Sequence, residues 1–415
     1  MGTAYAHARN KPAAIGMDGL EFARTARPAA FSPPPHNALN IDILSSLEGI
    51  PAAEWNALTG DNPFLRHEFL HALHETGCAS ERKGWAPRYL VARDDGRFAG
   101  AMPLYLKTHS RGEYVFDWAW ADAYERHGHE YYPKLLNAIP FTPVGGPRIL
   151  AERGEVRTLL AQQALALARE KQISSLHCLF PQPEDAACFA GLKMMVRHGV
   201  QFHWVNEGDT DFEQYLQRMN HAKRKKIKQE RRRVRDAGIT FRWIEGAAIR
   251  PDDWVFFARC YNRTYLEHHN TPYLNLAFFQ RIGETMPDNL LLIIAQREGR
   301  DIGASFNVRN QTRLYGRYWG ALEHHPMLHF EACYYQTIEY CLARGIQVFE
   351  GGAQGQHKMA RGLMPVQTCS YHWLAHPAFA SAVEDFLSRE TSGIAHYIDE
   401  LKEHAPFRTE SSAHG

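Results

Sequence analysis

Hydrophobic and polar residues alternate with two different spacings along the chain. Short apolar runs of strand length occur at 41–44, 174–180 and 239–244, and each lies next to a stretch with helical periodicity. The longest helical stretches are expected at 153–170 and 328–344. Strands that alternate with helices of this length predict an α/β (α+β) fold with mixed sheets.

One strand–turn–strand pattern occurs twice, about 200 residues apart. Residues 90–101 align without a gap with residues 293–304, and both copies carry an acidic residue followed by Gly at the turn. Such pairs are typical of tight hairpins. A second pattern, which ends in Trp ahead of a helical stretch, repeats at 50–55 and 249–254. Two repeats in the same order indicate a duplication, so we expect two similar α/β domains in tandem.

The repeats and the composition divide the chain into four expected segments. Residues 1–38 are rich in Ala and Pro and predict a disordered leader, with a transit peptide as the alternative. The two domains are expected at 39–207 and 208–405. Residues 406–415 are expected to form a flexible tail.

The composition excludes several classes of protein. A formal net charge of +1 gives no general field that would attract nucleic acid or an anionic membrane. No window approaches about 18 consecutive apolar residues, so we expect no membrane-spanning segment. Seven scattered cysteines without a Cys-x-x-Cys pair favour free thiols and a cytoplasmic location.

One segment is strongly basic despite the balanced net charge. Residues 223–235 hold nine Lys or Arg and one acidic residue, with Ile227 and Val234 as a narrow apolar seam. A helix of this kind suits the phosphates of a nucleic acid or of a nucleotide-linked substrate. The alternative is a solvated helix face without a ligand.

The densest polar chemistry follows an expected strand that ends at Glu350. Glycines and cationic or imidazole side chains come next: Gly351, Gly352, Gly355, His357, Lys358 and Arg361. Glycine N–H groups beside two fixed cations suit a carboxylate or phosphate. The segment lacks the Gly-Lys-Ser/Thr of a P-loop, and a structural turn with surface charges is the alternative.

Aromatic residues interleaved with polar ones follow both expected hairpins. The segments are 116–120, which contains Asp117 and Trp118, and 315–319, which contains Arg317 and Tyr318. Aromatic residues usually lie in a core, but one flank of each segment is also able to line a cleft.

The spacing His67-Glu68-x-x-His71 is that of helical zinc hydrolases. Phe69 and Leu70 form the apolar stripe of the same helix, and no third ligand follows downstream. Since the chain contains 23 histidines, a chance match is expected. The sequence therefore predicts no metal site.

Several longer segments, taken in order, resemble the FemAB-like proteins of the GNAT (Gcn5-related N-acetyltransferase) superfamily. They are Asn62-Pro63-Phe64, Gly112 to Trp118, Tyr131 to Leu135, Leu314 to Gly320 and Gly352 to Gly362. The resemblance covers roughly residues 40–395 and implies two tandem GNAT-like domains. It also implies transfer of an acyl or aminoacyl group to an amine, with a peptidoglycan precursor as one acceptor.

The resemblance leaves two donors open. Fem transferases use aminoacyl-tRNA, and their basic residue followed by Gly matches Arg361-Gly362. Simple acetyltransferases bind the CoA pyrophosphate through Arg/Gln-x-x-Gly-x-Gly/Ala, from which residues 317–322 depart at the last position. We expect no permanently bound cofactor, acyl-CoA or aminoacyl-tRNA as co-substrate, and tRNA contacts through 223–235.

Amine acylation needs a proton acceptor and a polarised carbonyl. We expect His357 or Glu350 to relay the proton and Tyr318 to protonate the leaving group. The expected substrate contacts are Lys358, Arg361, Gln354, Gly355, Arg317, Asp117 and Trp118. The alternative function is a non-catalytic protein that binds a cell-wall precursor or another anionic ligand.

Overall fold

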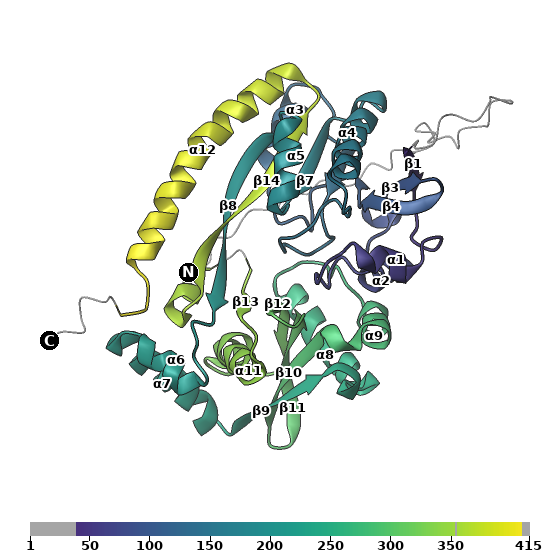
Figure 1. Ribbon diagram of the computed structural model, residues 1–415. Coiled ribbons are helices and arrows are strands. Elements are labelled where there is room, and N and C mark those ends of the chain that lie inside the picture. The colour runs from purple at the N-terminus through teal and green to yellow at the C-terminus, as the bar shows by residue number, and fades with distance from the viewer. Residues whose placement is uncertain (1–38, 353–354, 409–415) are drawn as a thin grey trace. The chain divides into compact units, whose positions relative to one another are not determined.

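The computed structural model describes residues 39–352 and 355–408 (Figure 1). The first half contains β1 (Leu39–Leu44), α1 (Ala52–Ala57), α2 (His67–Glu75), β2 (Trp85–Pro87), β3 (Tyr89–Asp94), β4 (Arg97–Met102), β5 (Tyr105–Lys107), α3 (Trp118–Arg126), β6 (Lys134–Asn137), α4 (Gly154–Glu170), β7 (Ser175–Leu179), α5 (Pro183–Gly191) and β8 (Met195–Val205).

The second half begins with two helices and ends with the longest one. It contains α6 (Phe212–Arg218), α7 (His221–Asp236), β9 (Ile239–Glu245), α8 (Pro251–Glu267), α9 (Leu276–Thr285), β10 (Leu290–Arg297), β11 (Arg300–Arg309), β12 (Arg313–Ala321), α10 (Leu328–Phe330), a π-helical turn (Glu331–Tyr335), α11 (Gln336–Arg344), β13 (Val348–Glu350), a 3-10 turn (Gln356–Arg361), β14 (Met364–Leu374) and α12 (Pro377–Glu403).

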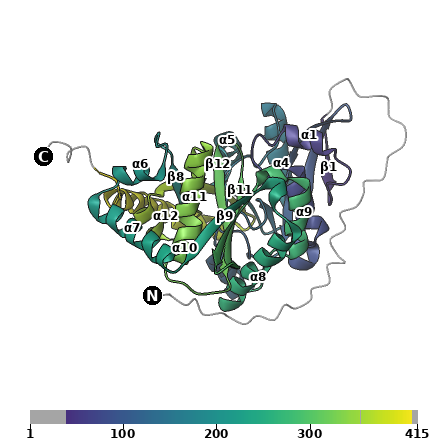
Figure 2. The same ribbon diagram turned by 90° about the horizontal axis from the view of Figure 1, so that it is seen from below.

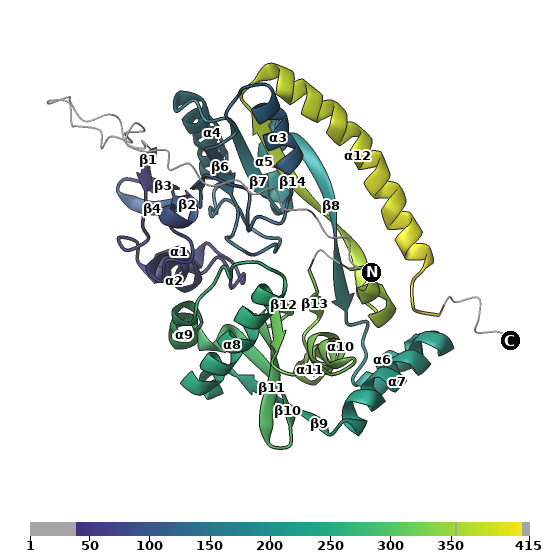
Figure 3. The same cartoon turned by 180° about the vertical axis from the view of Figure 1, so that it is seen from behind.

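One mixed sheet of eleven strands runs through both halves, in the order β2-β5-β6-β7-β14-β8-β13-β12-β11-β10-β9. The pairs β6–β7 and β12–β13 are parallel, whereas the neighbouring pairs are antiparallel. Strand β14 is the last described strand of the second half, yet it lies between β7 and β8 of the first half (Figure 3). A second sheet has the order β1-β3-β4. The predicted α/β fold with mixed sheets is confirmed.

The duplication is visible in backbone detail. The hairpins β3–β4 and β10–β11 turn at Asp95 and Glu298, with φ of 48° and 52°, and each is followed by a Gly with φ near 80°. A β-bulge follows Ala92 in the first copy and its counterpart Ala295 in the second. The repeated tryptophans of α1 and α8 are both buried. The two halves therefore share one plan.

A single hydrophobic core crosses from one half to the other. Helix α2 packs against α9, where the rings of Phe69 and Phe278 lie 5.5 Å apart, edge to face. Nearby, the Phe64 ring meets the Tyr315 ring of β12 at 5.1 Å. Burial of such aromatic rings is among the largest hydrophobic contributions per residue. The halves are therefore fixed to each other by packing as well as by the shared sheet.

A buried hydrogen-bonded network ties β14 to the first half. His372 Nδ1 lies 2.7 Å from His177 Nδ1, and His177 Nε2 lies 3.1 Å from the Tyr131 hydroxyl. Tyr131 donates to Asp117 Oδ2 at 2.6 Å, and the same oxygen accepts from Lys134. Burial lowers the pKa of His177 to about 3, so the imidazole stays neutral at ordinary pH. The network joins β14, β7, β6 and the start of α3.

Helix α6 lies beside α11, and α7 contacts β9 and the π-helical turn, away from the labelled helices of the first half (Figure 2). The long helix α12 packs along β8 and β14. In the part of the chain that the structure describes, no helix combines the length and apolar content that crossing a bilayer requires.

Glycine 320 provides a test of how closely α8 packs on β12. A Cβ added there would lie 2.0 Å from the Cys260 carbonyl oxygen. We expect Gly320→Ala to lower the free energy of unfolding by about 1–3 kcal/mol through overpacking. Gly154→Ala, at an open position in the first turn of α4, is expected to change it little. Chemical denaturation measures both, and equal effects would contradict this packing.

Candidate active site at the end of strand β13

Strands β12 and β13 diverge after a short parallel pairing. Their register ends with Tyr315 opposite Glu350, whereas β12 continues to Ala321. After Glu350 the chain leans toward β8, where the Gly351 N–H donates to the Phe202 carbonyl at 2.9 Å. Among the described strands, only β11 pairs with β12 beyond this point. The sheet therefore opens at the C-terminal end of β13.

Glu350 lies at this opening and is nearly buried. Its Oε1 accepts from Arg313 Nη1 at 2.9 Å, and its Oε2 lies 3.9 Å from His203 Nε2 on β8. Burial raises the pKa of Glu350, and the Arg313 charge opposes that rise. The pKa of His203 falls to about 4, because burial and the charges of Arg313 and Lys358 disfavour protonation. The site thus holds one carboxylate beside a neutral imidazole.

Lys358 contributes a cation that no carboxylate neutralises among the described residues. Its Nζ donates to the carbonyl oxygens of Gly351 at 2.5 Å and Gly352 at 3.3 Å, directly after β13. Burial lowers the pKa of Lys358 to about 8. At neutral pH the ammonium is therefore mostly present, balanced only by backbone dipoles.

His357 and Arg361 lie on the 3-10 turn that follows. Arg361 Nη2 binds both carboxylate oxygens of Glu230, at 3.0 and 2.9 Å, and its guanidinium stacks 3.5 Å above the Phe330 ring. His357 is exposed, with Nε2 3.2 Å from the Tyr334 hydroxyl. Partial desolvation of the ring, together with the charges of Arg361 and Lys358, lowers the pKa of His357. The imidazole is therefore neutral at neutral pH and able to accept a proton.

Arg317 and Tyr318 face a loop of the first half. Arg317 Nη2 donates to the Phe141 carbonyl at 2.6 Å, and the Tyr318 hydroxyl donates to the same oxygen at 3.2 Å. The Tyr318 ring packs against Tyr261 and Phe306. Burial raises the pKa of Tyr318 well above its usual range, so the phenol stays protonated.

The structure brings some of the expected site residues together and separates others. The charge of Arg317 opposes the rise in the Glu350 pKa, and the charge of Lys358 lowers the pKa of His203. The structure therefore brings Glu350, Arg317 and Lys358 into one region. Tyr318 packs with the core shared by the halves, whereas His357 contacts Phe330 and Tyr334 in a second core cluster.

The remaining expected contacts have different surroundings. Asp117 belongs to the buried network of β14, and Trp118 is 43% exposed at the start of α3. Gly355 precedes the 3-10 turn with a φ of 102°, a conformation that favours glycine. Gln354 lies outside the described residues.

Sequence reasoning missed His203, Gln201 and Arg313. Gln201 and His203 stand two positions apart on β8 and hydrogen-bond to each other at 3.2 Å, so strand alternation was a usable signal for this pair. Arg313 of β12 binds Glu350 of the neighbouring parallel strand β13, and no local sequence pattern indicates this contact. That contact could be found only from the folded chain.

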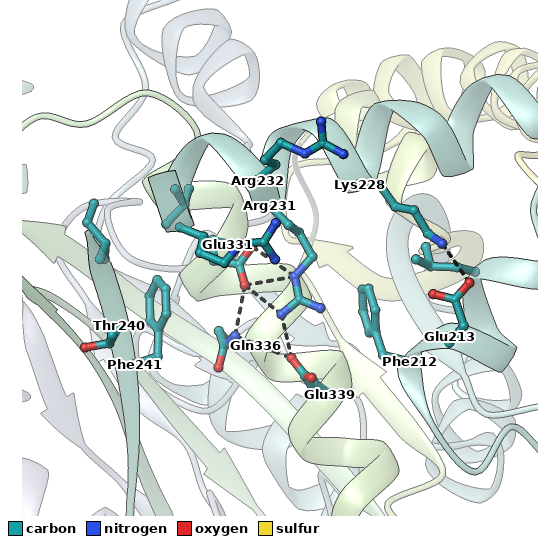
Figure 4. A pocket seen from close by; sticks show the side chains of 14 residues that line it. Phe212, Glu213, Lys228, Arg231, Arg232, Thr240, Phe241, Glu331, Gln336 and Glu339 are labelled. Atoms are coloured by element: carbon teal, nitrogen blue, oxygen red, sulfur yellow. Dashed lines mark hydrogen bonds and ion pairs between the residues drawn. The ribbon is translucent and has the colours of Figure 1, made fainter. Parts of the chain in front are cut away.

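A separate cavity of about 710 Å³ lies between α6, α7, β9 and the start of α11 (Figure 4). Inside it, Arg231 donates to Glu331 at 2.9 Å and to Glu339 at 2.6 Å, and stands 4.4 Å from the centre of the Phe212 ring. The charge of Arg231 is thus satisfied within the protein. Other cations of α7 form no ion pair with a described residue: Lys223, Arg224, Lys225, Lys226, Arg232, Arg233 and Arg235.

The zinc-type spacing at the start of α2 is engaged in local hydrogen bonds. His67 Nε2 lies 3.1 Å from the Leu47 carbonyl oxygen, and the Glu68 carboxylate accepts from Asn56 and Arg66. Within residues 39–352 and 355–408, no group of three or more metal-ligating side chains converges.

The depressed pKa of Lys358 predicts a pH-dependent stability difference. The Lys358 amine keeps its proton up to about pH 10.5 in the unfolded chain but only up to about pH 8 in the native chain. The free energy of unfolding of the wild type therefore rises as the pH increases from about 8 to about 10.5. Relative to Lys358→Met, that gain should reach up to about 3 kcal/mol. Denaturant titrations at pH 7.5 and 10 measure the difference. A constant gap between the two proteins would contradict the lowered pKa.

Comparisons with known proteins show which family the chain resembles. A family model described as FemAB-like, peptidoglycan biosynthesis/recognition, matches residues 46–409. No curated protein matches the chain. The match confirms the resemblance to FemAB-like proteins seen in the sequence.

Solved structures similar to this chain include three of low identity. FemX is 10% identical, covers 81% of this chain and 98% of its own, and has a TM-score of 0.49. A tandem GNAT protein from the clavulanic acid biosynthesis pathway is 15% identical, with 82% and 99% covered and a TM-score of 0.42. L-PGS from Bacillus licheniformis is 12% identical, with 81% and 97% covered and a TM-score of 0.49. On the family match, the chain belongs to the FemAB-like family.

Proposed function

We propose that this protein transfers an aminoacyl group from aminoacyl-tRNA to the amine of a peptidoglycan precursor. The observation that carries the proposal is the opening between β12 and β13, where Glu350 ends β13 and His357 and Lys358 lie on the turn that follows. Unpaired strand amides there are suited to polarise a carbonyl. The family description supports the cell-wall acceptor.

The identity of the donor is inferred from residues 317–322, the segment that resembles a CoA pyrophosphate motif. Residues 317–321 lie inside β12 instead of forming a loop. Gly320 packs on the Cys260 carbonyl, and Arg317 is bound to the Phe141 carbonyl, so both are engaged within the protein. The unpaired cations of α7 offer a phosphate-binding face instead. These contacts favour aminoacyl-tRNA over acyl-CoA.

The proposed reaction uses few groups. The acceptor amine attacks the ester carbonyl, a C–N bond forms, and the ester C–O bond breaks. Neutral His357 accepts the amine proton and returns one to the departing ribose oxygen. Lys358 holds an anionic part of a substrate, and Arg313 binds Glu350 beside it and opposes the rise that burial causes in the Glu350 pKa. Tyr318, protonated and bound to Phe141, supports the wall of the site.

Ligand-dependent melting tests the donor. Purified protein is titrated with acetyl-CoA, CoA, uncharged tRNA and aminoacyl-tRNA. A ligand that binds only the native state raises the free energy of unfolding, by about 2.7 kcal/mol at a ligand concentration of 100 times Kd, and therefore raises the melting temperature. We expect both tRNA forms to stabilise and CoA compounds to have no effect. Stabilisation by CoA compounds alone would contradict the proposed donor.

A transfer assay separates catalysis from binding. Radiolabelled aminoacyl-tRNA and a peptidoglycan precursor peptide with a free amine are incubated with the protein, and labelled amide is counted. Binding of tRNA without amide formation would favour the non-catalytic alternative.

His357→Gln should reduce the transfer rate by about 100-fold or more, because glutamine cannot accept the amine proton. Since the pKa of His357 lies below its usual 6.5, the wild-type rate should rise with pH to a plateau, with its midpoint below pH 6.5. His127→Gln, on an exposed histidine of the loop after α3, is the control. An unchanged rate or pH profile in His357→Gln would exclude this role.

A further inference from the structure

The single acidic residue in the basic segment 223–235 is buried. In α7 the buried side chains are Ile227, Glu230 and Val234, spaced along one helix face. A carboxylate on an inward face needs a partner, because burying an unpaired charge is costly. The partner of Glu230 is on the turn that carries His357.

Arg361 joins α7 to that turn. Its Nη2 binds both oxygens of Glu230, and the side chains of the pair are 4% and 7% exposed. The Tyr335 hydroxyl donates to the same carboxylate. On its other side, Arg361 Nη1 donates to the His357 carbonyl at 2.8 Å. One guanidinium therefore connects a helix side chain directly to the backbone of the turn.

The turn has other anchors among the described residues: Lys358 Nζ donates to the Gly351 carbonyl at 2.5 Å, His357 Nε2 lies 3.2 Å from the Tyr334 hydroxyl, and Met359 is buried in a core cluster. It begins after Gly355 and ends at Gly362, both with positive φ, so its ends are glycine hinges. The Tyr215 hydroxyl donates to the Arg361 carbonyl at 2.6 Å. Among these anchors, Arg361 is the one whose side chain is held by a side chain of α7, so Glu230 contributes to the position of His357.

The opposite face of α7 is free for a ligand. Lys225 and Arg232 are two helical turns apart, so they lie on one line, and that line is on the side away from Glu230. Both are exposed and form no ion pair with a described residue. A phosphate backbone bound there contacts the same helix that holds the turn.

We propose that Glu230 is a positioning residue that couples donor binding on the outer face of α7 to the placement of the His357 turn. The inference rests on the proposed function, because it takes α7 as the tRNA-binding face. Coupling is reciprocal, so a ligand that fixes the turn should also raise the affinity of α7 for tRNA.

Hydrogen exchange with uncharged bulk tRNA as the probe tests the coupling. We expect tRNA to slow exchange of the amides at 357–363 in wild type at least five-fold, and to leave it unchanged in Glu230→Gln, which should bind tRNA within two-fold of wild type. The transfer rate of Glu230→Gln should fall about 100-fold with an unchanged donor Kd, as expected when a catalytic group is misplaced by about 1 Å.

The matched control is Glu213→Gln. Glu213 accepts from Lys228 of α7 at 2.7 Å, so it is also an acid paired with this helix, but it lies on α6 and its bond does not reach the turn. Glu213→Gln should keep the tRNA-dependent protection. Arg361→Lys keeps the buried charge while removing the bond to the His357 carbonyl, and it should abolish the protection if Glu230→Gln fails to fold.

The outcomes separate the two proposals. Equal protection of the turn in wild type, Glu230→Gln and Arg361→Lys overturns the inference alone. If tRNA fails to bind the wild-type chain, the proposed donor is excluded and the coupling with it. Loss of protection in Glu213→Gln as well would show a general effect of helix charge and would also overturn the role of Glu230.

Discussion

The insertion of β14 between β7 and β8 is the constraint on which the candidate site depends. Strand β8 pairs with β14 on one edge and with β13 on the other, so His203 faces Met364 in one register and Glu350 in the other. Without β14, the eleven-stranded sheet would lose its link between β7 and β8. Strand β8, which pairs with β13 beside the opening, is therefore held in the sheet by β14, the last described strand.

Buried charge helps to hold this arrangement. Burial alone would raise the pKa of Asp117, but Lys134 and His177 hold it well below its usual value, so the carboxylate remains ionised. Lys134 also donates to Glu113 at 2.8 Å, with all three side chains buried. Removing one partner of such a pair typically costs about 3–5 kcal/mol. Asp117 thus serves the anchoring of β14, a role that its position after an aromatic run did not reveal.

Local patterns predicted the fold better than the site. The hairpin repeat, the acidic–Gly turns and the helix of 223–235 follow from short-range chemistry, and the structure confirms them. Helix α12 was not predicted from the sequence, although Val383, Leu387, Ile398 and Leu401 have helical spacing. Strand order in a sheet is set by distant pairing, and no local pattern encodes it.

The cations show most clearly why sequence alone falls short at the site. The sequence treats Lys358 and Arg361 alike, as two positive charges three positions apart. In the folded chain, Arg361 is neutralised by Glu230 and stacked on Phe330, whereas Lys358 meets only backbone carbonyls. Electrostatic attraction for an anionic ligand depends on charge that the protein has not already satisfied. That charge remains at Lys358 and on the outer face of α7, while Arg361 connects the two structurally. Ligand attraction and positioning are thereby divided between two neighbouring cations of one turn.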